Sequence, residues 1–204
     1  MTGLSWPRLG IVATLASHIL LVSSGSVAQE PRIAGLGPAV TVSVGYAYLN
    51  SEIPSAGRIS ENGVATSLAT EFTRRFGIKG EISYTRTYGA FGIPHHSDVL
   101  AYLAGPVIYP VRRKRFAIYG EGLVGAARIV GVVPQNNGLY LFAYVQNPAW
   151  ALGAGVETPL SRSIALRTGV DYFRASYFTP ANLIRGQGNT RALISLVYTF
   201  GKAR

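Results

Sequence analysis

Cysteine is missing from this chain of 204 residues. Its absence excludes disulfide crosslinks and thiol chemistry, so the fold must be held by packing and by backbone hydrogen bonds. Acidic residues are few, 9 against 19 lysines and arginines, and they form no cluster that suggests a metal site. A glycine-rich phosphate loop followed by a helix is also lacking. We therefore expect no cofactor, no metal ion and no catalytic residue.

Long apolar runs are absent after residue 28. Within residues 1–28, Arg8 precedes an uncharged apolar run at 9–22, and small residues follow up to Ala28. This order is typical of a secretory signal peptide, because the run is shorter than the roughly 20 residues that a spanning helix needs. Cleavage after Ala28 would leave Gln29 as the mature N-terminus. An uncleaved anchor is the alternative.

The clearest pattern in the remaining chain is a period of two in residues 150–172. Apolar side chains alternate with small residues and with Glu157, Arg167 and Asp171. Such alternation predicts strands, and the brief interruption at 161–163 predicts an antiparallel hairpin. A face of glycine, alanine and a few charges suits the narrow interior of a small closed barrel, with the apolar face toward lipid. A soluble two-layer sheet is the alternative.

The same alternation recurs along the chain and predicts an all-β protein, an eight-stranded antiparallel transmembrane β-barrel at 39–200. Residues 29–38 would be a short lead and 201–204 a tail. Short connections at 75–77, 110–115 and 161–163 alternate with longer ones. Periodicity does not decide which way the fourth and fifth strands face, and Gly105-Pro106 suggests a bend in the fourth. The predicted strands are 39–50, 63–74, 78–88, 98–109, 116–129, 150–160, 164–172 and 191–200, with 139–145 extending the sixth beyond a break at Asn147-Pro148.

Aromatic residues are predicted to form two girdles on the lipid-facing surface. Near the rim with the longer connections we expect Tyr46, Tyr48, Tyr84, Tyr88 and Tyr172. Near the rim with the short connections we expect Phe72, Tyr109, Phe116, Tyr198 and Phe200.

The terminal segment Leu196-Val197-Tyr198-Thr199-Phe200-Gly201 resembles the last strand of bacterial outer-membrane barrels. Together with the hairpin at 151–172, it is similar to the porin-like outer-membrane barrel family of OmpA/OmpX type. The resemblance implies an outer-membrane location, with short turns in the periplasm and longer loops outside. It also implies that Tyr198 and Phe200 serve as a signal for the barrel assembly machinery. The chain departs from the family pattern because four residues follow Phe200, and no peptidoglycan-binding activity is implied.

Charged residues on the polar parity of the strands are predicted to lie in the lumen. An unpaired charge there would be costly, because the wall excludes water. Glu157 and Arg167 are equally distant from the turn centred on Arg162, so they should pair across the hairpin. Asp171 lies about 13 Å from Arg167 along its strand and needs a partner from elsewhere. The predicted lumen charges are Glu71, Lys79, Glu81, Glu121, Glu157, Arg167 and Asp171.

Basic residues gather at the predicted periplasmic turns. They are not interleaved with base-stacking aromatics, so nucleic acid is not an expected partner. They solvate the turns, or they attract anionic phospholipid headgroups at about 1 kcal/mol per residue. The basic rim consists of Arg74, Arg75, Arg112, Arg113, Lys114, Arg115 and Arg162.

These observations favour a non-enzymatic, monomeric outer-membrane barrel with a structural or surface-interaction role and a largely plugged polar lumen. Its expected partners are membrane lipids, including lipopolysaccharide. A narrow channel is the first alternative. A lipid A acyl-chain enzyme is the second, since His95 and Ser97 match part of a His-x-Ser motif, although the acidic residues that follow are Asp98 and Glu121.

Overall fold

The computed structural model describes residues 39–53, 57–89, 95–134, 140–175 and 187–200. The predicted signal peptide, its cleavage site at Ala28 and Gln29, the lead at 29–38 and the tail at 201–204 lie outside the described residues. None of the described residues forms a helix long and apolar enough to span a membrane.

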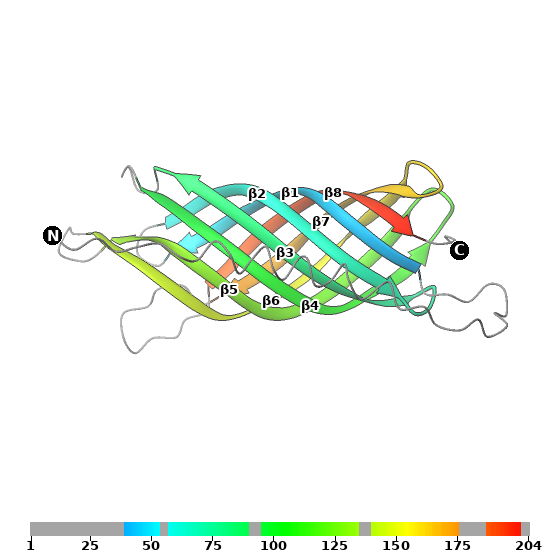
Figure 1. The fold of residues 1–204 in the computed structure, drawn as a ribbon, viewed down its shortest axis with the longest axis horizontal. Helices are drawn as coiled ribbons and strands as arrows, with labels where there is room; N and C mark the ends of the chain where they lie inside the picture. Colours follow the sequence, from blue (N-terminus) through cyan, green and yellow to red (C-terminus); the bar gives the residue numbers. More distant parts are fainter. Residues whose placement is uncertain (1–38, 54–56, 90–94, 135–139, 176–186, 201–204) are drawn as a thin grey trace, which may run out of the picture. The chain divides into compact units, whose positions relative to one another are not determined.

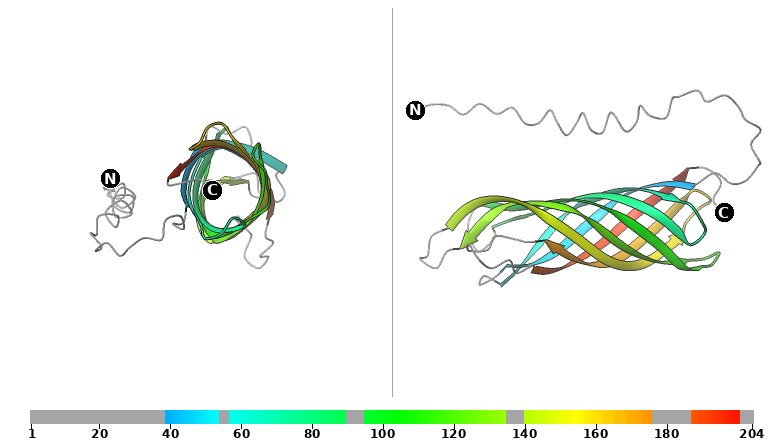
Figure 2. Two further views of the ribbon diagram at one scale, coloured as in Figure 1. Left: turned by 90° about the vertical axis from the view of Figure 1, so that its right-hand side faces the viewer. Right: turned by 90° about the horizontal axis from the view of Figure 1, so that it is seen from below.

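The described chain forms eight antiparallel strands that close into a barrel, as predicted. Each strand pairs with its neighbours in sequence, and β1 pairs with β8 to close the sheet. Figure 1 shows the strands slanted across the barrel axis, and Figure 2 shows the closed ring in end view. The strands are β1 (Ala39–Ile53), β2 (Gly57–Glu71), β3 (Phe76–Tyr88), β4 (His96–Arg112), β5 (Ala117–Pro134), β6 (Tyr140–Pro159), β7 (Ile164–Ala175) and β8 (Gln187–Phe200).

Alternation along the strands divides the side chains between lumen and exterior. The exterior carries a broad apolar belt; for example, Val64, Val124 and Leu152 are 59%, 67% and 64% exposed. A belt of this kind on a closed sheet is what lipid requires, because closure leaves no edge strand with an unpaired row of backbone groups. The end that carries residues 72–75, 113–116 and 160–163 is called the turn end below, and the opposite end the loop end.

The strands run further toward the loop end than predicted. β2 begins at Gly57 rather than at 63, β5 continues to Pro134, and β6 runs without a break through Pro148, which pairs with Ala126. The predicted limits followed the loss of apolar alternation, which reports lipid contact rather than strand pairing. Backbone pairing continues where the exterior turns polar: Tyr48 pairs with Asn62 and Asn50 with Ser60, and the hydroxyls of Tyr48 and Ser60 hydrogen-bond at 2.8 Å.

β4 and β5 owe their ambiguous pattern to an interior that is itself apolar. Tyr119, Glu121 and Leu123 share the inward face of β5, opposite inward-facing residues of β4 such as Leu103. Tyr109 is 1% exposed and faces the lumen, so its predicted place in the lipid girdle is wrong.

The irregularity in β4 is also displaced from its predicted position. Its register shifts between Ile108 and Val111, next to Pro110, which has no N–H for the ladder. Gly105 instead permits a close approach of two strands, because a Cβ there would lie 2.1 Å from the backbone oxygen of Gly122.

Candidate functional site: the filled lumen

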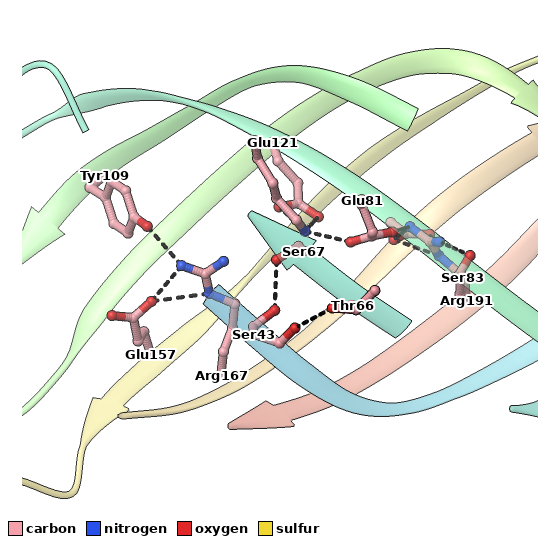
Figure 3. A network of polar contacts seen from close by, with 12 residues as sticks. Ser43, Thr66, Ser67, Glu81, Ser83, Tyr109, Glu121, Glu157, Arg167 and Arg191 are labelled. Carbon is pink, nitrogen blue, oxygen red and sulfur yellow. Dashed lines mark hydrogen bonds and ion pairs between the residues drawn. The ribbon is translucent and has the colours of Figure 1, made fainter. Parts of the chain in front are cut away.

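The middle of the lumen holds a cluster of charges from four strands. Lys79 Nζ lies 2.6 Å from Glu81 Oε2 and 2.9 Å from Glu121 Oε2. Both residues of β3 and Glu121 of β5 face inward, and none of the three side chains is more than 5% exposed. The inward faces of β3 and β5 therefore bring together Lys79, Glu81 and Glu121, all three predicted to lie in the lumen. Figure 3 labels the two glutamates.

Arg191 of β8 completes this cluster, although sequence reasoning did not select it. Its guanidinium donates to both carboxylate oxygens of Asp171, at 2.8 to 3.1 Å, and to Ser83 Oγ at 2.9 Å. It also forms an ion pair with Glu81 at 2.6 Å, without hydrogen-bond geometry. Arg191 stands directly opposite Asp171 in the β7–β8 register, and that pairing was the signal that could have identified it. Asp171 thus takes its partner from a neighbouring strand, as predicted.

A second cluster lies nearer the turn end along β7. Arg167 Nη2 lies 2.7 Å from Glu157 Oε2, and the two residues face each other in the hairpin register, as predicted. The same nitrogen donates to Tyr109 Oη at 2.8 Å. Figure 3 shows the arginine held between these two partners. Tyr109, an unexpected lumen residue, thus supplies an acceptor that the charge pattern did not reveal.

Two glycines on the inward face of the β6–β7 hairpin make room for Tyr119, although at Gly155 the backbone oxygen of Thr168 would be closer still to a Cβ, at 2.1 Å. Gly155 and Gly169 are paired across the hairpin. A Cβ at these positions would lie 2.6 Å and 2.2 Å from Tyr119 Oη. The ring also lies under the guanidinium of Arg167, with 5.0 Å between Cζ and the ring centroid. The glycines therefore form a recess for the Tyr119 side chain, which comes from the adjacent strand β5, where Tyr119 pairs with Gly155.

The turn end of the lumen carries a third pair, which joins a predicted lumen charge to a predicted rim residue. The guanidinium of Arg112 donates two hydrogen bonds to the carboxylate of Glu71, at 2.5 Å and 2.8 Å. These side chains keep 23% and 14% of their surface in solvent, so the pair is only partly buried. Arg112 is therefore not a free rim charge. The remaining basic-rim side chains, Arg74, Arg75, Arg113, Lys114, Arg115 and Arg162, are exposed.

Toward the loop end, the lumen filling becomes apolar. This apolar layer lies directly beyond the charged clusters, with Phe173 two residues past Asp171 and Leu123 two residues past Glu121. Arg191 Cζ lies 5.6 Å from the Phe173 ring, so charge and apolar surface meet there. The prediction of a polar lumen is thus only half right. The apolar layer comprises Leu49, Val99, Ala101, Leu103, Leu123, Ala127, Ile129, Ala149, Ala151, Phe173 and Ala175.

Glu61 is a further buried carboxylate in the lumen. The prediction missed it because residues 51–62 were expected to form a loop. It lies in β2, fully buried, and accepts a hydrogen bond from Thr85 Oγ1 at 2.7 Å. Its other oxygen has no hydrogen-bond partner among the described residues. Alternation that continues past the apolar belt was the signal that could have placed it inside.

The structure does not assemble the His-x-Ser arrangement on the lipid face. His95 is exposed and precedes β4, whereas Ser97 is buried on the inward face. Glu121, a candidate acid, is bound to Lys79. Within the described ranges, no group of three or more histidine, cysteine, aspartate or glutamate residues is placed to hold a metal ion.

Tyr198 and Phe200 face outward near the turn end of β8, as predicted. Their rings contact each other edge to face, with centroids 4.7 Å apart, and about half of each side chain is exposed. Their role in assembly stays a prediction.

Comparisons with known proteins support the architecture. The crystal structure of Ail, the attachment invasion locus protein of Yersinia pestis, superposes with a TM-score of 0.57 and 16% identity, over 80% of this chain and 99% of Ail. Neisserial surface protein A gives a TM-score of 0.58 and 12% identity over 79% and 97%. Outer membrane protein OprG from Pseudomonas aeruginosa gives 0.53 and 14% over 80% and 96%.

The fold is that of the eight-stranded outer-membrane β-barrels. No family model and no curated protein sequence matches the chain. The lipid-facing belt and the closed eight-stranded sheet together place the protein in the bacterial outer membrane, with the turn end in the periplasm and the loop end outside. The connections at 89–95, 135–139 and 176–186 are longer than the three four-residue turns, which agrees with this orientation. The predicted long connection between the first two strands is wrong, because β1 and β2 extend until only residues 54–56 join them.

Proposed function

We propose that the protein is a non-enzymatic outer-membrane barrel with a closed lumen, which acts as a rigid support for its outward-facing end. The observation that carries this proposal is the filling of the lumen in two successive layers. Six charged side chains, between 1% and 5% exposed, are joined by ion pairs and hydrogen bonds: Lys79, Glu81, Glu121, Arg167, Asp171 and Arg191.

Each layer opposes conduction for a different physical reason. In the charged layer, an entering ion would have to replace partners that already neutralise one another at short distance. In the apolar layer, side chains such as Leu123, Ile129 and Phe173 offer no ligands to a hydrated ion. An eight-stranded barrel is just wide enough for its side chains to fill, so these layers suffice to close it.

Single-channel recording of the refolded protein in planar bilayers tests the closed lumen. We expect wild type to be silent and a Leu123→Ala/Phe173→Ala/Lys79→Ala/Glu121→Ala variant, which thins both layers, to conduct. A matched variant carries alanine at the lipid-facing Val124, Leu152 and Val170 and should stay silent. Regular ohmic steps from the wild-type protein would instead support the narrow channel.

The loop end supports a surface-interaction role, because the paired strands continue beyond the apolar belt. In this part of the wall Arg86 and Asp98 form a two-point ion pair at 2.7 Å, and Arg86 also donates to Tyr88 Oη at 3.0 Å. Such side chains are held in position before any partner binds, which lowers the entropic cost of association.

Lipopolysaccharide is the partner we propose for this exterior, because Arg86 and Arg128 stand beside tyrosines in the outer half of the wall. Arg128 Cζ lies 4.9 Å from the Tyr144 ring. Vesicles with and without lipopolysaccharide should differ in the thermal stability of the inserted barrel, and an Arg86→Ala/Arg128→Ala variant should lose the difference. The same difference in wild type and variant would argue against this partner.

The barrel assembly machinery is the partner we propose for β8. Phe200→Asp should reduce the amount of folded barrel in the outer membrane, whereas Val170→Asp, an outward change on a strand without the terminal aromatic, controls for lipid-face charge alone. The folded fraction is read from heat-modifiable gel mobility in membrane fractions. Equal losses in the two variants would mean that Phe200 acts only as a lipid-facing residue.

A further inference from the structure

At the periplasmic end, the β2–β3 turn, the last residues of β4 and the turn that follows line an open pocket of about 480 Å³. Tyr109 N donates to the backbone oxygen of Arg75 at 2.8 Å, which ties the β2–β3 turn to the end of β4. The pocket therefore belongs to two connections that are far apart in sequence. Its lining residues are Arg74, Arg75, Tyr109, Pro110, Val111, Arg112 and Arg113.

The pocket has four arginines and little negative charge to offset them. Glu71 engages Arg112, whose Nε is removed from solvent and has no hydrogen-bond partner among the described atoms. No carboxylate of the described residues lies within ion-pair distance of Arg74, Arg75 or Arg113. Three guanidinium groups are thus available to an anion. Guanidinium forks match the oxygens of a phosphate, so phosphate is the group that this chemistry selects.

The framework of the pocket is held by local hydrogen bonds. Thr73 Oγ1 accepts from the backbone nitrogens of Arg75 and Phe76, at 3.2 Å and 3.0 Å. Arg113 N donates to the Phe116 oxygen at 2.8 Å. The Arg112 guanidinium lies over the Tyr109 ring, 3.9 Å from its centroid. An anion would therefore meet a fixed backbone frame and a positioned Arg112, around which the exposed side chains of Arg74, Arg75 and Arg113 can close.

The lipid-facing edge beside the pocket indicates the source of the phosphate. Phe72 and Phe76 flank the β2–β3 turn and are 62% and 58% exposed, and Ile108 lies opposite Phe76 in the β3–β4 register. Exposed aromatics at a barrel rim mark the level of the lipid headgroups. A phospholipid could therefore lay its chains along this apolar edge while its phosphate reaches the arginines.

We propose that this pocket binds the phosphate of an anionic phospholipid in the inner leaflet of the outer membrane. The binding is distinct from general attraction by a basic rim, because four arginines line one pocket beside an apolar edge. It is also independent of the lumen closure proposed above, since none of its free arginines takes part in the lumen network.

The third periplasmic turn supplies a matched control. Ser161 Oγ accepts from the backbone nitrogens of Ser163 and Ile164, the same arrangement that Thr73 makes in the β2–β3 turn. Arg162 is exposed there and does not line the pocket, and neither does Arg115. An Arg115→Ala/Arg162→Ala variant therefore removes the same charge as Arg75→Ala/Arg113→Ala while it leaves the pocket complete.

The experiment measures retention of phosphatidylglycerol by the refolded barrel in nanodiscs with a phosphatidylcholine background. Retention is quantified by native mass spectrometry and by the rise in Tm on addition of the anionic lipid. The pocket variant should bind at least about 30-fold more weakly than wild type, because it loses two charge-assisted hydrogen-bonding groups at the phosphate, whereas the control variant should lose threefold or less. A heat-modifiable gel shift verifies that each variant is folded.

Two results would overturn the proposal. Equal losses in the two variants would show that only the overall charge of the rim matters. Inorganic phosphate at millimolar concentration that displaces the lipid from wild type, with the same Tm rise by itself, would show a site for the free anion instead of a lipid headgroup.

Discussion

The charged and the apolar layers both fill the lumen, the first with ion-paired side chains and the second with apolar packing. Both fill the interior of the same narrow wall, and β5 and β7 each pass from one to the other within two residues, at Glu121–Leu123 and Asp171–Phe173. In the charged layer each group depends on a particular partner, whereas in the apolar layer neighbours share the contact surface. The comparison implies that the charged layer is the more sensitive to loss of a single side chain, since removal of one partner leaves a buried charge uncompensated.

Removal of Arg191 should have the largest effect, because it leaves Glu81 and Asp171 buried near one another without their shared cation. We expect Arg191→Ala to lower the free energy of unfolding by about 3–5 kcal/mol, measured by urea titration in lipid vesicles with gel-mobility readout. Arg191→Met combined with Glu81→Gln and Asp171→Asn removes the negative charges that lost Arg191, while Lys79 keeps Glu121 as its partner, and should recover most of the loss. A triple variant as unstable as Arg191→Ala would show that packing rather than charge decides.

Truncation in the apolar layer should cost somewhat less. Leu123→Ala should lower the free energy of unfolding by about 2–4 kcal/mol in the same titration, because it leaves a cavity among residues that remain compatible with one another. Leu152→Ala on the lipid face is the matched control, since lipid can fill the space it leaves, and should cost less. A larger loss at Leu152 would show that the outer belt, rather than the lumen, dominates stability.

Adding a side chain in the glycine recess should lower the free energy of unfolding by less than truncation of Leu123 but by more than loss of Arg112. Gly169→Ala would place a methyl group against Tyr119 Oη, and the displaced ring should cost about 1–3 kcal/mol of unfolding free energy. The second-site change Tyr119→Phe removes the conflicting hydroxyl and should restore part of the loss in the same assay. A double variant no more stable than Gly169→Ala would mean that the backbone contact across the hairpin, not the tyrosine, requires glycine.

The partly exposed pair at the turn end should contribute least. Arg112→Ala should cost about 1 kcal/mol or less, and the loss should shrink as salt is raised from 0.05 M to about 1 M. The Arg191→Ala loss should change much less over this salt range, because water and ions do not reach that pair. If the two losses respond equally to salt, the charged layer is hydrated rather than sealed.

Much of the fold could be predicted because successive residues of a membrane-spanning strand face lipid and lumen in turn. Apolar and polar side chains therefore alternate along the sequence. The hairpin register that pairs Glu157 with Arg167 followed from counting residues on each side of a short turn. The inward placement of Lys79, Glu81 and Asp171 followed from parity alone, whereas the facing of β5, and with it that of Glu121, did not. These inferences needed only local regularity, since successive side chains of a strand point to opposite faces.

Other features escaped prediction because they depend on which side chains meet inside the lumen. In the sequence, Tyr109 and Tyr119 cannot be told from lipid-facing aromatic residues. The inward position of Tyr109 is explained by its hydrogen bond with Arg167, and that of Tyr119 by the recess at Gly155 and Gly169. Arg191 and Glu61 lay at or beyond the predicted ends of their strands. There the exterior becomes polar, and alternation no longer distinguishes lumen from surface.

The sequence by itself determined the strand count, the antiparallel connectivity and the side of the wall that most charges occupy, because these follow from period-two patterning and short turns. Only the tertiary structure decided which charges meet, where the lumen turns from charged to apolar, and that two distant turns form one arginine pocket. Those features depend on the closure and stagger of the whole sheet, which bring together residues from strands that no local pattern connects.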